Sequence, residues 1–260
     1  MTKARKKISW LMFTSPPNFY ALVNFLLPWL WGIAAIAGIA GLYFSFFIAP
    51  ADYQQGNSYR ILYIHVPAAW MGMFIYLLMA AYSAIYLVWK IKLADVMARS
   101  LAPTGAIMTF ISLWTGAFWG APTWGAYWVW DARLTSSLVL LFLYLGYIAL
   151  HSAADDQEKG GKMAALLALI GAVNVPIIYM SVKWWNTLHQ GMTVTLTDRP
   201  SMAPEMFWSL LLMLIACWTY CAAATLARAR NEILTRDAGS RWVQELFTKS
   251  QATKNTGGVK

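Results

Sequence analysis

The chain has 260 residues, of which 59% are hydrophobic and only 12% are charged. Soluble domains carry about 25% charged residues, so this composition excludes an ordinary soluble protein and indicates an integral membrane protein. The net charge of +9 comes mainly from segments between apolar runs, so it indicates membrane topology and not a nucleic-acid-binding surface.

The first predicted element is a transmembrane helix over residues 22–48, which follows a basic N-terminus, Met1–Lys7. A basic segment before an apolar run is also typical of a secretory signal, and Ala49-Pro50-Ala51 faintly resembles a cleavage site. The apolar run is longer than the core of a signal peptide, which spans about 7–15 residues. We therefore expect an uncleaved first span.

Five further apolar runs are long enough to cross a bilayer, which takes about 20 mostly apolar residues. Backbone groups in hydrocarbon must pair within their own segment, so each run is expected to be helical. The predicted class is an all-α integral membrane protein with six transmembrane helices. Residues 1–235 form one membrane domain, and residues 236–260 form a cytoplasmic, partly disordered tail. The five further helices are predicted over 67–89, 101–118, 134–150, 163–183 and 206–227.

The direction of insertion follows from the basic residues. Sixteen of the 20 Lys and Arg residues lie at the two termini or in the loops on the same side as the termini. Cytoplasmic segments carry the excess of Lys and Arg, so both termini are predicted to be cytoplasmic. The four remaining basic residues lie on the outer side: Arg60, Arg133, Lys183 and Arg199.

Proline and tail patterns make two smaller predictions. Pro28 and Pro176 fall inside spans, where each removes a helix hydrogen bond and is expected to kink its helix. Trp242, Val243, Leu246 and Phe247 have the spacing of a short amphipathic helix on the membrane surface. Residues 249–260 have the composition of a disordered segment.

A tryptophan-rich segment, residues 119–137, lies outside the membrane between the third and fourth helices. Tryptophans are common at membrane interfaces, but Trp119, Trp124, Trp128 and Trp130 are denser than an interfacial belt requires. Trp124 and Trp128 are four residues apart, and Gly and Pro residues punctuate the run. We expect a short helix along the surface that presents an apolar platform to a flat ligand.

Two of the three histidines, His65 and His189, lie near span ends on the outer side, flanking this platform. Two neutral imidazoles on opposite sides of a macrocycle can ligate a haem iron axially. The alternative is that each is an interfacial polar side chain with no ligand. His151 lies at the inner end of the fourth span, so it cannot join the other two and is interpreted as structural.

Three charged residues belong to the same outer surface. Arg60 and Arg133 are candidates to bind the two carboxylates of a porphyrin through charge-assisted hydrogen bonds; the alternative is ordinary charge flanking a span. Asp131 either pairs with Arg133 or orients the loop backbone, and the sequence leaves both interpretations open.

The run Trp119-Gly … Trp124-Gly … Tyr-Trp-Val-Trp130-Asp-Ala-Arg-Leu-Thr135 resembles the WWD signature of the haem-handling proteins of cytochrome c maturation. Three branches share this signature: the system I haem lyase, the system II cytochrome c synthase and haem exporter protein C (CcmC). The length and the six spans match the CcmC branch, and the similarity covers about residues 10–230. The two external haem-ligand histidines of that branch fall on His65, in Tyr-Ile-His-Val-Pro, and on His189, in Trp-Trp-Asn-Thr-Leu-His-Gln-Gly.

The resemblance implies a function and a set of partners. It implies that haem b is held at the periplasmic face of a bacterial inner membrane, between the two histidines and the WWD segment. It also implies delivery to the periplasmic chaperone CcmE, alongside the ABC transporter subunits CcmA and CcmB and the small membrane protein CcmD. The chain has no P-loop pattern, which agrees with ATP hydrolysis by a partner. Whether the chain itself catalyses covalent attachment of haem to the chaperone stays open.

Two other functions compete with haem delivery. A membrane cytochrome for electron transfer would place its histidine pair within the spans, whereas here no histidine lies mid-span. A haem or solute permease would carry charged residues along a path through the membrane, and the spans contain essentially none near their centres. Both patterns favour a haem site at the outer face.

Overall fold

The computed structural model of the protein describes residues 15–185, 187–189 and 201–248. Within these ranges six helical segments are long and apolar enough to cross a membrane, as predicted, with α5 and α6 together forming the fifth. The helices are α1 (Pro16–Tyr43), continued by the π-helical turn η2 (Phe44–Ile48), η3 (Asn57–Ile61) leading into α2 (Leu62–Trp89), α3 (Lys92–Trp124), α4 (Ala132–Ala153), α5 (Gln157–Gly171), α6 (Asn174–Trp184) and α7 (Pro204–Arg236).

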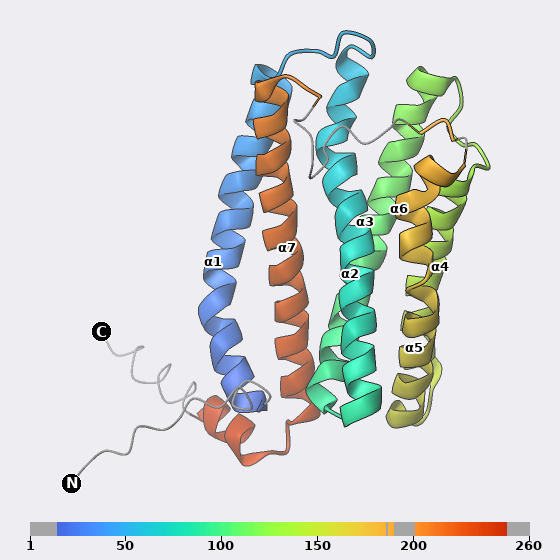
Figure 1. Ribbon diagram of the computed structural model, residues 1–260. Coiled ribbons are helices and arrows are strands. Elements are labelled where there is room, and N and C mark those ends of the chain that lie inside the picture. The colour runs from blue at the N-terminus through green and yellow to red at the C-terminus, as the bar shows by residue number, and fades with distance from the viewer. Residues whose placement is uncertain (1–14, 186, 190–200, 249–260) are drawn as a thin grey trace, which may run out of the picture.

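The helices stand side by side and run roughly along one axis (Figure 1). Helix α1 packs against α7, and α2 packs against α3. Helix α4 packs against α5 and α6. The bundle has two ends that differ in character. The histidine end, uppermost in Figure 1, carries the connections that follow η2, α3 and α6; the basic end carries the start of α1 and the end of α7.

Several helices extend beyond the apolar runs from which they were predicted. The predicted third span began at residue 101 and ended at 118, but α3 covers Lys92–Trp124. The extra turns contain polar or mixed residues, and a helix continues through them because its backbone bonds do not depend on side-chain polarity. Hydropathy therefore located the membrane crossings but underestimated the lengths of the helices.

The fifth span is interrupted between Gly171 and Asn174, where α5 ends and α6 begins. Pro176 lies just beyond the break, and a proline ring clashes with the carbonyl four residues earlier, here that of Ala172. The kink expected at Pro176 is thus confirmed as a break in the helix. By contrast, α1 passes through Pro28 without interruption.

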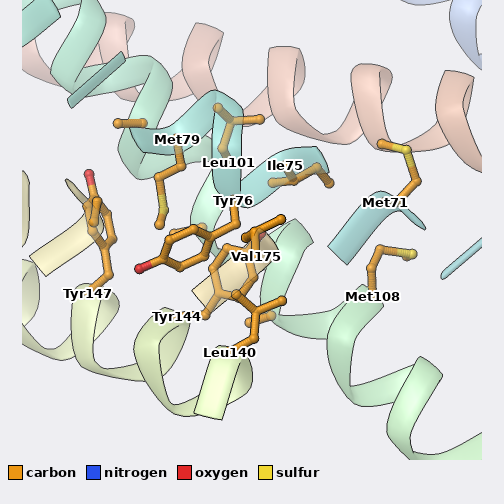
Figure 2. Close-up of a cluster of buried hydrophobic side chains, with 14 of the residues drawn as sticks. Met71, Ile75, Tyr76, Met79, Leu101, Met108, Leu140, Tyr144, Tyr147 and Val175 are labelled. Atoms are coloured by element: carbon orange, nitrogen blue, oxygen red, sulfur yellow. The ribbon is translucent and has the colours of Figure 1, made fainter. Parts of the chain in front are cut away.

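Tyrosines from α2 and α4 occupy the centre of the bundle (Figure 2). The rings of Tyr76 and Tyr144 meet edge to face, with centroids 4.9 Å apart, and both side chains are fully buried. The Tyr144 hydroxyl donates to the backbone carbonyl of Gly72 at 2.7 Å, which satisfies its polar group inside the core. Gly105 leaves the space on α3 against which the Tyr144 ring lies.

The basic end has its own polar and apolar contacts. His151 is buried, with Nε2 3.3 Å from the Tyr147 hydroxyl and 3.5 Å from Asp95 Oδ1, in agreement with a structural role. Residues 241–248 are helical, as predicted, and Val243 is buried at the foot of the bundle. Residues 249–260, which are predicted to be disordered, lie outside the described part of the chain. The N-terminal residues 1–14 also lie outside it.

Candidate functional site

A hollow of about 820 Å³, part of it open to solvent, lies at the histidine end between α2, α3, α4 and α6. Ligand sites typically have mostly apolar walls with a few polar groups. This hollow has that character, and both predicted ligand histidines line it. Its walls include His65, Thr109, Ser112, Trp119, Trp124, Arg133, Ile178 and His189.

The two histidine rings face a common space although they are far apart in the sequence. His65 lies in the first turn of α2, and His189 lies in the segment that follows α6. Their ring centroids are 6.4 Å apart and their planes are inclined by 37°. A metal–imidazole bond is about 2.0 Å long, so two rings that share one ion have centroids about 6 Å apart. The observed separation fits one shared metal centre.

A threonine on α3 orients the His65 ring. Thr115 Oγ1 donates its proton to the Ile111 carbonyl at 2.6 Å. The same oxygen lies 3.1 Å from His65 Nδ1, so it accepts a hydrogen bond from the Nδ1–H group. This assignment places the ring proton on Nδ1 and leaves Nε2 with a lone pair, which is the form that binds a metal. Gly116 lies against the same ring: a Cβ there would be 3.0 Å from His65 Cε1.

Trp119 forms one wall of the site and is held from outside it. Its ring meets those of His65 and Tyr59 edge to face, each at a centroid distance of 5.6 Å. Its indole Nε1–H donates to Gln55 Oε1 at 2.7 Å. The sequence interpretation included Trp119 but missed Thr115, Gly116 and Gln55, because single polar or small residues carry no recognisable spacing.

Trp124 ends α3 and lies beside His189, with ring centroids 6.4 Å apart. The expected short surface helix through Trp124 and Trp128 is wrong. The helix α3 continues through Trp119 to Trp124, Gly125 terminates it with a φ of +77°, and residues 126–131 are not helical. Glycine adopts this left-handed conformation without a steric penalty, and it commonly ends helices for that reason. The tryptophan run is therefore a helix end followed by a loop.

The remaining predicted tryptophans and Asp131 lie outside the lining of the hollow, in that loop. Trp128 and Trp130 meet edge to face at 5.4 Å, and Trp130 is 78% exposed. Asp131 is the N-cap of α4 and accepts a hydrogen bond from the Leu134 N–H group at 2.7 Å. Of the two interpretations left open, Asp131 therefore orients the backbone. Trp130 and Asp131 also line a shallow hollow with Thr187 and Leu188, the residues just before His189.

The two arginines have different positions. Arg133 lines the hollow and donates to the Ile178 carbonyl at 3.2 Å, so one cationic group faces the site from α4. Arg60 donates to the Ser45 carbonyl and to Asn57 Oδ1. Arg60 thus joins η2 to η3, and it does not belong to the described lining of the hollow.

The chain matches a known protein family. The family model for heme exporter protein C matches residues 9–244. The chain belongs to the heme exporter protein C family. It is 49% identical to heme exporter protein C of Escherichia coli (strain K12) over 90% of this chain and 94% of the relative. The corresponding proteins of Haemophilus influenzae and Bradyrhizobium diazoefficiens are 47% and 48% identical, over 86% and 85% of this chain and 89% and 84% of theirs.

The match to the heme exporter protein C family covers all six membrane helices and both histidines of the hollow. It also extends farther than the predicted range of about 10–230, into the short helix that begins at residue 241.

Proposed function

We propose that this protein binds haem b as cargo at the outer face of a bacterial inner membrane and passes it on for cytochrome c maturation. The observation that carries the proposal is the pair His65 and His189, 6.4 Å apart in an apolar hollow at the end of the bundle. Haem supplies an iron with two open axial positions, and two imidazoles are the groups that fill them.

The residues of the hollow fit a porphyrin in charge and shape. Trp119 and Trp124 are large flat groups on its walls, and Arg133 is a cation for a propionate. Arg60 and Asp131 support the site indirectly: Arg60 joins η2 to η3, and Asp131 caps α4.

Membership of the heme exporter protein C family supports a set of partners. The protein acts with the ABC transporter subunits CcmA and CcmB and with CcmD, and it hands haem to the periplasmic chaperone CcmE. The exposed position of Trp130, at the loop that borders the residues before His189, supports chaperone docking there. The protein positions haem for transfer, and the excess of basic residues at the other end of the bundle supports an orientation with this site outside the cytoplasm.

The absorption spectrum of the purified protein tests the proposal. Full-length protein from haem-replete cells should carry about one haem per chain with a low-spin spectrum, because two nitrogen ligands saturate the iron. Haem content is measured by pyridine haemochrome and spin state by electron paramagnetic resonance. A purely high-spin spectrum, or no bound haem after reconstitution, would rule out ligation by both histidines.

Replacing Thr115 with valine should lower haem affinity about tenfold, because loss of an outer-shell hydrogen bond to a metal-ligating histidine typically costs about 10–100-fold. The shape of the side chain is kept, but His65 Nδ1 loses the hydroxyl that orients its ring. Thr115→Ser keeps the hydroxyl and should restore both the affinity and the resonance signature of the ligand field. Equal haem affinities for the Val and Ser variants would contradict the assigned hydrogen bond.

A further inference from the structure

A second hollow lies at the basic end of the bundle, between α3, α4 and α7. Its volume is about 770 Å³, part of it open to the surroundings. It is lined by the last turns of α4 and α7 and by the early turns of α3, so it is at the opposite end from His65 and His189. The proposed haem site therefore does not account for it.

Two arginines line this hollow. Arg99 Nη1 bonds Glu232 Oε1 at 2.7 Å, and Arg228 Nη1 donates to Thr104 Oγ1. A guanidinium group has five N–H donors, and each of these contacts engages a single nitrogen. Among the described residues Glu232 is the one carboxylate of the lining, so the lining itself carries one more positive than negative charge; Asp95 lies behind it, beside His151. An anionic group that also accepts hydrogen bonds complements this lining.

An apolar stripe on α3 continues from the hollow toward the membrane centre. Arg99, Pro103, Ile107 and Phe110 are spaced by four, four and three residues, so they lie on one face of the helix. Ile107 is 48% exposed and Phe110 is 54% exposed, as expected of side chains that contact lipid. The distance along the helix from Arg99 to Phe110 is about 16 Å at 1.5 Å per residue, close to half of the roughly 30 Å hydrocarbon core.

We propose that this hollow binds an anionic phospholipid of the inner leaflet. The phosphate lies at Arg228 and Arg99, and one acyl chain runs along Ile107 and Phe110. Basic pockets between transmembrane helices on the cytoplasmic side are a known mode of anionic headgroup binding. A free phosphate ion would use the arginines but would gain nothing from the apolar stripe, so the combination specifies a lipid. The lipid would join α4 and α7 across α3.

Native mass spectrometry of the full-length protein tests the site. Phosphatidylglycerol should be retained in preference to phosphatidylcholine. Arg228→Gln should weaken phosphatidylglycerol binding about five-fold, the effect expected of one basic residue near the membrane surface. Arg230→Gln is the matched control, because Arg230 is on the same helix but its Nη1 donates to Asn24 on α1, at 2.9 Å. Equal retention by the two variants would overturn the proposal.

A second measurement needs no variant. Phosphatidylglycerol with a photoreactive group midway along one acyl chain should label α3 near Ile107 and Phe110 in the wild-type protein. Labelling spread evenly over the lipid-facing helices would contradict the site. Displacement of the lipid by millimolar inorganic phosphate would also contradict it, because it would show that the hollow recognises a free anion and not a lipid.

Discussion

Replacing either His65 or His189 with alanine should remove most of the bound haem and abolish the low-spin spectrum of what remains. Each substitution deletes one of the two imidazoles whose centroids are 6.4 Å apart, so the iron would keep at most one protein ligand. Haem affinity should fall by at least tenfold, measured by titration of the apoprotein with haem. Added imidazole should restore part of the low-spin signal, because it fills the vacated position.

His151→Gln is the matched control for these two variants. It also removes an imidazole, but at the basic end, where His151 contacts Tyr147 and Asp95. This variant should bind haem as the wild type does, even if its thermal stability falls. The ligand assignment would fail if both alanine variants kept the low-spin spectrum, or if His151→Gln lost it to the same extent.

Replacing Gly105 with alanine should destabilise the folded protein by about 1–3 kcal/mol, the usual cost of adding a methyl group to a filled core. A Cβ at this position would lie 2.2 Å from Tyr144 Cζ. The ring cannot easily move, because it packs on Tyr76 and its hydroxyl bonds the Gly72 carbonyl. Thermal unfolding can be followed with a thiol-reactive dye, since Cys221 is buried and is exposed on unfolding.

Gly32→Ala provides the control for Gly105→Ala. Gly32 lies inside α1, and an added Cβ would meet nothing within 4 Å. Alanine is favoured over glycine within a helix by about 0.8–1.0 kcal/mol, so this variant should unfold at the same temperature as the wild type or slightly higher. Similar losses of stability in both variants would show that the contact with Tyr144 is not the cause.

The tryptophan run shows where sequence reasoning succeeded and where it failed. The density of tryptophans marked an unusual segment, but the spacing of Trp124 and Trp128 predicted one helical platform. In the structure Trp124 belongs to α3 and Trp128 to a loop, because Gly125 ends the helix between them. A four-residue spacing describes a shared face only if the helix continues, and a single glycine decides that.

The partners of the charged side chains could also not be predicted from the sequence. Arg60 and Arg133 had equal claims as propionate partners, yet only Arg133 lines the hollow in the described structure. Arg60 bonds the Ser45 carbonyl, in a segment fifteen residues earlier. Long flexible side chains reach several alternative partners, so the choice depends on which backbone groups the fold leaves nearby.

The sequence by itself determined the membrane class, the six crossings and the pair His65 and His189, because hydrocarbon thickness and charge bias impose one-dimensional patterns on the chain. Only the tertiary structure decided that these two rings share one hollow and that Thr115 leaves Nε2 of His65 available. Those relations join atoms from different helices. They depend on packing distances between segments, and residue order along a single chain does not encode these distances in any local pattern.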